Sequence, residues 1–153
     1  MYVNSYMSAA FFPSRGVRQG CSLSPLLYVL SIEVLAANLR ASKAIPGLRL
    51  PHVSTPLSAV SLYADDTTVI ALSDTAILEV FRVYARFEAG TGSKLNLGKC
   101  EGLWLVPLCF RTNLPVEIQW SSSKLKILPV FISYDEMGEI NWRPRVDAFL
   151  PVY

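Results

Sequence analysis

The feature that most constrains the fold is a helix that is apolar on almost every side and begins at Ser24-Pro25. Ser24 can cap the helix with its hydroxyl, and Pro25 has a φ angle already suited to the first helical position. The stretch 26–39 that follows is interrupted by three polar residues, Ser31, Glu33 and Asn38. The pattern predicts a helix to about Arg40. Because a helix without a polar side is normally buried, we expect this one at the centre of the domain.

The composition is that of one folded domain with an unusually apolar surface. A length of 153 residues suits a single domain. A hydrophobic fraction of 52%, a charged fraction of 17% and a mean hydropathy of +0.35 exclude intrinsic disorder. The longest apolar stretch is too short to cross a bilayer, and the net charge of +2 does not by itself indicate a nucleic-acid partner. We expect an apolar face that contacts a neighbour in a larger fold.

The cysteines give information on the compartment. The chain has three, Cys21, Cys100 and Cys109, without any C-x-x-C pair. Neither a disulfide framework nor a zinc site is therefore supported. This usage favours a reducing intracellular compartment, and it does not distinguish the nucleus from the cytoplasm.

The remaining elements predict an α+β domain, an antiparallel sheet with helices packed on one face. Extended or hairpin structure is expected at the N-terminus, further strands between the helices, and an amphipathic second helix capped by Asp74 and ended by Gly90 and Gly92. The expected strand segments are 2–12, 60–63, 67–72, 103–106 and 124–132. A last helix is expected to open at Asn141.

Asp65 and Asp66 are adjacent carboxylates between two strand-prone runs. At a rigid turn such a pair can bind a divalent cation between the protein and a substrate phosphate. Aspartate is also a favoured turn residue because its side chain hydrogen-bonds to the local backbone. The residues alone leave both interpretations open.

Two loops have residues suited to a nucleotide. The loop 15–25 contains Arg15, Arg18, Gln19 and Gly20. Arginines can hold phosphate, glutamine can read a base or sugar edge, and glycine lets a substrate approach the backbone. The alternative is a plain helix-entry loop.

The second loop, 92–100, contains Lys94 and Lys99. Either lysine can act on phosphate as a cation or a proton donor, and a solvated turn is the alternative.

These segments together resemble the palm of reverse transcriptases from LINE-type (non-LTR) retrotransposons. The likeness begins with Tyr-Ala-Asp-Asp at 63–66, which follows Arg-Gly-Val-Arg-Gln-Gly-Cys-Ser-Leu-Ser-Pro-Leu-Leu at 15–27. Downstream, 92–100 resembles the family's next motif, 126–131 its primer-grip strand, and 141–145 the sequence that leads into its thumb. The resemblance implies a partial palm over residues 1–135 and the start of a thumb-like connection over 136–153.

The resemblance also implies an activity, a cofactor and partners. The activity is RNA-directed DNA polymerisation with two Mg²⁺ ions, in which the primer 3′-hydroxyl attacks the α-phosphate of a dNTP. Asp65 is implied to be the main metal ligand and Asp66 its companion. The implied partners are an RNA template, a DNA primer, a dNTP and the remainder of the polymerase, with no membrane.

The other candidate residues receive roles from the same resemblance. Gln19 and Gly20 are implied to line the nucleotide and template pocket, with Arg15 and Arg18 as nearby phosphate contacts. Lys99 is the candidate general acid for the pyrophosphate leaving group, and Lys94 is its alternative.

Three departures from the family pattern shape the expectation for activity. The family's first catalytic aspartate lies on a strand upstream of all these motifs, and neither Glu33, on the buried helix, nor Asp74, at a helix cap, replaces it. Ser22 and Pro129 stand where the family has proline and glycine, and Pro129 is expected to remove a ladder hydrogen bond from the primer-grip strand. We therefore expect the chain to be inactive alone.

Two alternatives differ in class. The first alternative to a reverse transcriptase is a non-catalytic remnant that at most binds nucleic acid or protein through its apolar face. The second is a metal-dependent phosphohydrolase, which needs further carboxylate or histidine ligands.

Overall fold

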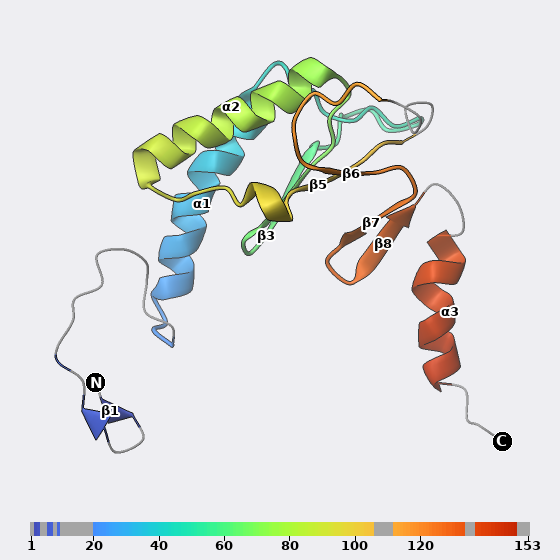
Figure 1. The fold of residues 1–153 in the computed structure, drawn as a ribbon. Helices are drawn as coiled ribbons and strands as arrows, with labels where there is room; N and C mark the ends of the chain where they lie inside the picture. The colour runs from blue at the N-terminus through green and yellow to red at the C-terminus, as the bar shows by residue number, and fades with distance from the viewer. Residues whose placement is uncertain are drawn as a thin grey trace.

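The computed structural model describes residues 2–3, 6–7, 9, 20–105, 112–133 and 137–149. Its elements, drawn in Figure 1, are β1 (Tyr2–Val3), β2 (Tyr6–Met7), α1 (Ser24–Ala41), β3 (Val60–Tyr63), β4 (Asp66–Val69), α2 (Asp74–Thr91), the 3₁₀ helix η1 (Leu97–Lys99), β5 (Glu101–Leu103), β6 (Gln119–Ser121), β7 (Lys124–Ile127), β8 (Val130–Ser133) and α3 (Met137–Phe149). The predicted α+β class is confirmed. The described strands form two-stranded sheets, in which β1–β2, β3–β4 and β7–β8 are antiparallel hairpins and β5–β6 is a parallel pair.

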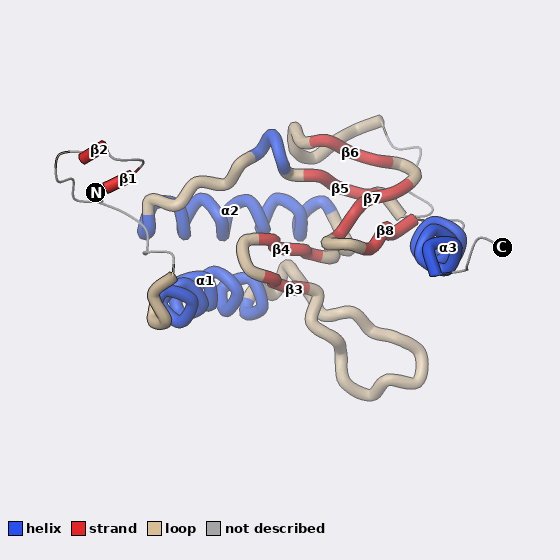
Figure 2. Tube along the Cα trace, turned by 90° about the horizontal axis from the view of Figure 1, so that it is seen from below, coloured by secondary structure: helices blue, strands red, loops and turns tan. Residues whose placement is uncertain are grey.

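The hydrophobic core lies where α1 and α2 pack on each other and on the β3–β4 hairpin (Figure 2). Its buried members come from both helices, from the hairpin and from the segment that connects α1 to β3: Leu35, Leu39, Ile45, Ala59, Val60, Ala76 and Val83. Because three elements supply these side chains, the core fixes the hairpin relative to both helices.

The apolar side chains of helix α1 are buried only along its second half, where it meets these partners. Leu35 is 1% exposed and Leu39 is fully buried, whereas Leu30 is 68% exposed. The expectation of a helix buried along its whole length is therefore wrong for its first half, because the described elements leave most of that half uncovered. Exposed large apolar side chains lie on this part of the chain, at Leu23, Leu26, Leu27, Val29, Leu30 and Val34. Their expected contact with a neighbour stays a prediction. Among the described residues, no helix combines the length and apolarity needed to span a membrane.

The start of α1 differs from the prediction by one residue. Leu23 holds the cap position without a side-chain hydrogen bond, and its backbone is already helical, with φ −81° and ψ −24°. Ser24 therefore lies inside the helix, and its N–H donates to the carbonyl of Cys21 at 3.1 Å. Pro25 occupies the first turn as expected.

Helix α2 ends at Gly92 as predicted, although Gly90 lies inside it, and its cap is one residue earlier than predicted. The cap is Ser73, which has an extended backbone and whose side chain accepts a hydrogen bond from the N–H of Ala76 at 3.1 Å. Asp74 is the first helical residue, where a negative charge suits the helix dipole. Gly92, with φ +70°, ends the helix in the left-handed conformation and donates to the carbonyl of Glu88.

Strands β7 and β8 form a hairpin where the sequence predicted strand structure over 124–132. Leu128 and Pro129 make the turn, and Leu128 has a φ of +55°. Pro129 therefore lies outside the strands, so the expected loss of a ladder hydrogen bond is wrong. The cause is the positive φ at Leu128, a conformation that leucine rarely adopts and that its sequence does not signal.

The last helix, α3, begins at Met137 and not at Asn141, so Pro144 lies inside it and not near its start. A proline there removes one helical hydrogen bond. An ion pair of 2.7 Å between Arg143 and Glu139 spans one turn of the exposed helix.

Strands β5 and β6 are joined by two stacked indole rings. The ring centres of Trp104 and Trp120 lie 4.3 Å apart, and the angle between the ring planes is 13°. Gly102 of β5 lies against the Trp120 ring, where a Cβ atom would collide with the indole. The predicted strand 103–106 starts earlier, at Glu101, and ends at Leu103.

Candidate functional site

Asp65 and Asp66 lie at one end of the β3–β4 hairpin. Tyr63 pairs with Asp66, so Ala64 and Asp65 form a two-residue turn. Ala64 has a φ of +51°, in the left-handed region that alanine rarely adopts. The predicted hairpin is confirmed, although Asp66 belongs to β4 and the strand ends at Val69 instead of Leu72.

The pleat of the hairpin separates its core side from its solvent side. Val60 and Leu62 of β3 pack into the core. Side chains on a strand alternate between faces, so Tyr63 and its partner Asp66 lie on the opposite, solvent-facing side. Both aspartates are exposed, and neither pairs with a cationic side chain within the described part of the chain. The carboxylates are therefore open to a cation from solvent.

Helix α1 contacts this turn through Tyr28. Its hydroxyl donates to the carbonyl of Ala64 at 3.3 Å. Burial of the phenol, and next the negative charge of Asp65, raise the pKa of Tyr28 above its usual range. The hydroxyl therefore keeps the proton that it donates. Sequence reasoning missed this residue, and the available signal was that Tyr28 is aromatic whereas the other large apolar residues of the helix are aliphatic.

Helix α2 and the segment after it reach the core side of the same hairpin. Tyr84 of α2 hydrogen-bonds with Thr67 of β4. Burial raises the pKa of Tyr84 above its usual range, the hydrogen bond to Thr67 opposes that rise, and nearby Cys100 and Tyr28 add to it. Burial also raises the pKa of the Cys100 thiol.

Lys94 and Lys99 are both exposed in the segment that ends at Cys100. Within the described residues, no ion pair or hydrogen bond links either ammonium group to Asp65 or Asp66. The carboxylate of Glu88 accepts a hydrogen bond from the N–H of Leu95 and so holds this segment to α2. The proton-donor role of Lys99 stays a prediction.

The loop before α1 is described only from Gly20 onward. Gly20 has a φ of +80°, which favours glycine, whereas Arg15, Arg18 and Gln19 lie outside the described residues. Their expected roles at the nucleotide and template pocket therefore stay predictions.

Cys21 lies exposed at the start of α1. The backbone N–H of Leu23, and next the hydroxyl and backbone of Ser24, hydrogen-bond to its thiol and lower its pKa.

The two aspartates suit a magnesium ion. Mg²⁺ prefers oxygen ligands and is commonly bound by one or two carboxylates together with substrate phosphates and water. Among the described residues, no third aspartate, glutamate, histidine or cysteine joins the pair.

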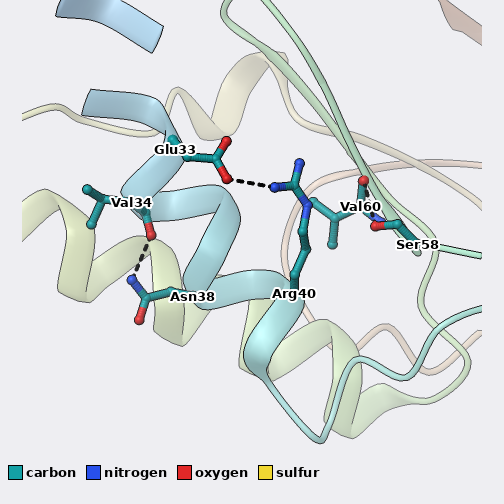
Figure 3. A network of polar contacts seen from close by, with 6 residues as sticks. All are labelled: Glu33, Val34, Asn38, Arg40, Ser58 and Val60. Carbon is teal, nitrogen blue, oxygen red and sulfur yellow. Dashed lines mark hydrogen bonds and ion pairs between the residues drawn. The ribbon is translucent and has the colours of Figure 1, made fainter. Parts of the chain in front are cut away.

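Glu33 does not supply the missing ligand, because its carboxylate pairs with Arg40 at 2.8 Å (Figure 3). Its side chain is 56% exposed, so the expectation that it lies on a buried helix is wrong.

A second group of residues suited to nucleic acid lies on the β7–β8 hairpin. Lys126 pairs directly with Phe131, and Lys124 lies two residues before it on the same side. The Nζ atoms of Lys124 and Lys126 each lie 5.7 Å from the centre of the Phe131 ring, within range of a cation–π interaction. We call these three residues the basic–aromatic face.

Comparison with known proteins identifies the family. Residues 2–130 match the family model described as reverse transcriptase (RNA-dependent DNA polymerase). An uncharacterised 149 kDa protein of the transposon TX1 from Xenopus laevis is 33% identical over 143 residues, 88% of this chain and 10% of the relative. An uncharacterised mitochondrial protein of Arabidopsis thaliana is 38% identical over 69 residues, 43% of this chain and 56% of the relative.

A third relative comes from Drosophila melanogaster. It is the retrovirus-related Pol polyprotein from a type-2 retrotransposable element, 28% identical over 97 residues, 63% of this chain and 9% of the relative. The chain thus spans about a tenth of the length of the Xenopus and Drosophila relatives. With most of its length matched, the chain belongs to the reverse transcriptase family, and its relatives are those expected of a LINE-type, non-LTR retrotransposon.

Proposed function

We propose that this chain supplies part of the catalytic centre of an RNA-directed DNA polymerase, with Asp65 and Asp66 as its metal ligands. Members of this family are nucleotidyltransferases that use a divalent metal and a nucleic-acid template and primer. The observation that carries the proposal is the pair of exposed carboxylates on a turn that Tyr28 holds against α1. We further propose that residues 1–135 are palm and residues 136–153 begin a thumb-like connection.

The two aspartates would hold Mg²⁺ from different positions on the hairpin. Asp65 lies in the turn and Asp66 at the start of β4, so one rigid element positions both carboxylates. Two bound Mg²⁺ ions would activate the primer 3′-hydroxyl and stabilise charge on the phosphates of the dNTP. Tyr28 supports the turn from the protein side, because its bond to Ala64 restrains the residue immediately before Asp65.

The remaining roles belong to residues that flank the hairpin in the sequence. Gln19 and Gly20 would line the nucleotide and template pocket, with Arg15 and Arg18 on phosphate. Lys99 would give a proton to the departing pyrophosphate, with Lys94 as the alternative donor. The basic–aromatic face would contact the primer strand, since lysines bind phosphate and an aromatic ring stacks on bases.

We expect residues 1–153 alone to bind metal weakly and not to extend a primer. Two-metal chemistry needs carboxylates on more than one side of the ion pair, and the described residues bring two carboxylates together on one hairpin. The further ligand would come from a part of the polymerase outside the described residues.

Metal binding by the full chain tests the assignment of the aspartates directly. Mn²⁺ binding would be followed by electron paramagnetic resonance for the unmodified chain and for Asp65→Asn, Asp66→Asn and Asp147→Asn. Asp147 is an exposed aspartate on α3 and serves as the matched control. We expect the first two substitutions to weaken binding about tenfold, equivalent to about 1.4 kcal/mol, and the control to leave it unchanged. Equal affinity in all four proteins would contradict the proposal.

Primer extension tests the activity. Residues 1–153 would be assayed alone and fused to the upstream segment of an active relative, on an RNA template with a DNA primer. We expect activity from the fusion and none from the chain alone. Asp65→Asn should abolish the fusion's activity, whereas Pro129→Gly should change it little, because Pro129 lies in a turn. Undiminished activity of the fusion after Asp65→Asn would show that Asp65 is not a metal ligand.

A further inference from the structure

Strand β8 has an outer edge whose backbone N–H and carbonyl groups make no hydrogen bonds within the hairpin. Ile127 and Val130 close the two-residue turn, and Lys126 and Phe131 form the next pair. In an antiparallel ladder the pairs alternate, so the pair after the closing one makes no hydrogen bonds across the strands. The N–H and carbonyl of Phe131 consequently point away from β7, where they require another partner.

Asn141 of α3 supplies that partner with both ends of its amide. Its Oδ1 accepts from the N–H of Phe131 at 2.7 Å, and its Nδ2 donates to the carbonyl of Phe131 at 2.7 Å. The same Nδ2 donates to Met137 of its own helix at 2.9 Å, and Arg145 adds a bond to the carbonyl of Pro129 at 3.1 Å. The planar amide thus pairs with β8 as a neighbouring strand would, and it fixes the hairpin beside α3 (Figures 1 and 2).

The residue held in this way carries the ring of the basic–aromatic face. The backbone of Phe131 determines where its ring projects, and the ammonium groups of Lys124 and Lys126 lie near that ring. Fixing the Phe131 backbone to α3 therefore fixes the direction of all three side chains relative to the helix.

We propose that Asn141 is a positioning residue that locks the β7–β8 hairpin onto α3 and thereby orients the basic–aromatic face toward a nucleic-acid strand. The identity of that ligand rests on the proposed function, whereas the lock between Asn141 and Phe131 does not.

Amide hydrogen exchange at Phe131 in the full 153-residue chain tests the lock. Asn141→Leu keeps the size of the side chain and removes its hydrogen bonds, and Asn141→Asp keeps the acceptor alone. The matched control is Asn38→Leu, because Asn38 donates to Val34 one turn back in its own helix, at 2.6 Å (Figure 3). We expect exchange at Phe131 to accelerate about tenfold in Asn141→Leu and less in Asn141→Asp, with no change in the control.

Affinity for a fluorescently labelled DNA primer annealed to an RNA template tests the orientation. Asn141→Leu should weaken binding about three- to tenfold, and the control should bind as the unmodified chain does. In a chain that already carries Lys124→Gln and Lys126→Gln, Asn141→Leu should add a clearly smaller loss, because Asn141 acts in part through those lysines. A merely structural residue would add its full effect in both backgrounds.

Four results would overturn the proposal: unchanged exchange at Phe131 in Asn141→Leu, accelerated exchange with unchanged affinity, an undiminished loss in the lysine-substituted chain, or no binding by the unmodified chain. If Asn141→Leu unfolds the hairpin, the same comparisons are made with Asn141→Asp. The Mn²⁺ titration of Asp65 and Asp66 is independent of Asn141, so failure of the lock and failure of the proposed function give different results.

Discussion

Two leucines on the same helix should differ strongly in how much stability is lost when their side chains are removed. Leu35 is 1% exposed and lies in the core, while Leu30, five residues earlier on α1, is 68% exposed. The same substitution, leucine to alanine, can therefore be made at both positions. Helix propensity cancels in the comparison, because alanine is at least as good a helix former as leucine at either site.

The expected magnitudes follow from this burial. A buried leucine replaced by alanine costs roughly 2–5 kcal/mol, and the cost rises as the remaining cavity stays open. Leu35 is held among side chains from α1, α2 and the β3–β4 hairpin, so the cavity cannot close by moving one element alone. We expect Leu35→Ala to lower the free energy of unfolding by about 3 kcal/mol. Leu30→Ala should change it by less than about 0.5 kcal/mol.

Urea unfolding followed by circular dichroism at several protein concentrations measures both effects. With a urea dependence of about 2 kcal/mol per molar, 3 kcal/mol moves the midpoint by about 1.5 M, whereas the Leu30→Ala midpoint should stay near that of the unmodified chain. Equal shifts for the two variants would refute the argument. A loss at Leu30 that grows with protein concentration would show that a second copy covers the first half of α1 in solution.

Three other predictions concern single positions. Gly102→Ala should destabilise the chain by about 1–3 kcal/mol in the same urea assay, because the new methyl group meets the neighbouring indole ring; an unchanged midpoint would contradict this packing. Leu128→Gly should stabilise it by about 1 kcal/mol by relieving the positive φ, and a lower midpoint would argue against a left-handed residue in that turn. In peptide-resolved alkylation, Cys21 should reach half its maximal rate at a lower pH than Cys100. Hydrogen bonds, chiefly from the N–H of Leu23, lower the pKa of Cys21, whereas burial raises the pKa of Cys100. The reverse order of the two cysteines would refute both assignments.

Local signals predicted the element types well and the ends of elements less well. Pro25 and Gly92 marked one end of α1 and of α2 correctly, because each residue has a backbone preference that acts without tertiary help. The caps were predicted at Ser24 and Asp74, and each lies one residue earlier, at Leu23 and Ser73, because the flanking backbone decides which neighbouring residue holds the cap position.

Features that depend on distant partners could not be predicted in this way. An apolar pattern on every side of α1 indicates that the helix needs cover, but it does not show whether this chain provides it. The bonds of Asn141 to Phe131 and of Tyr28 to Ala64 join residues 10 and 36 positions apart. The paired aspartates could be found from sequence because they are adjacent, whereas their support required the structure.

The core is contained in a short part of the chain, and this has a consequence for the order of folding during synthesis. All of its buried and partly buried members lie between Ile32 and Phe87. A nascent chain that has emerged as far as Phe87 therefore holds every side chain of this core, and a chain begins to fold from its N-terminal part during synthesis. The turn with Asp65 and Asp66 would then be in place on the ribosome before the β7–β8 hairpin has been translated, and the later hairpin would add to a support that is already folded.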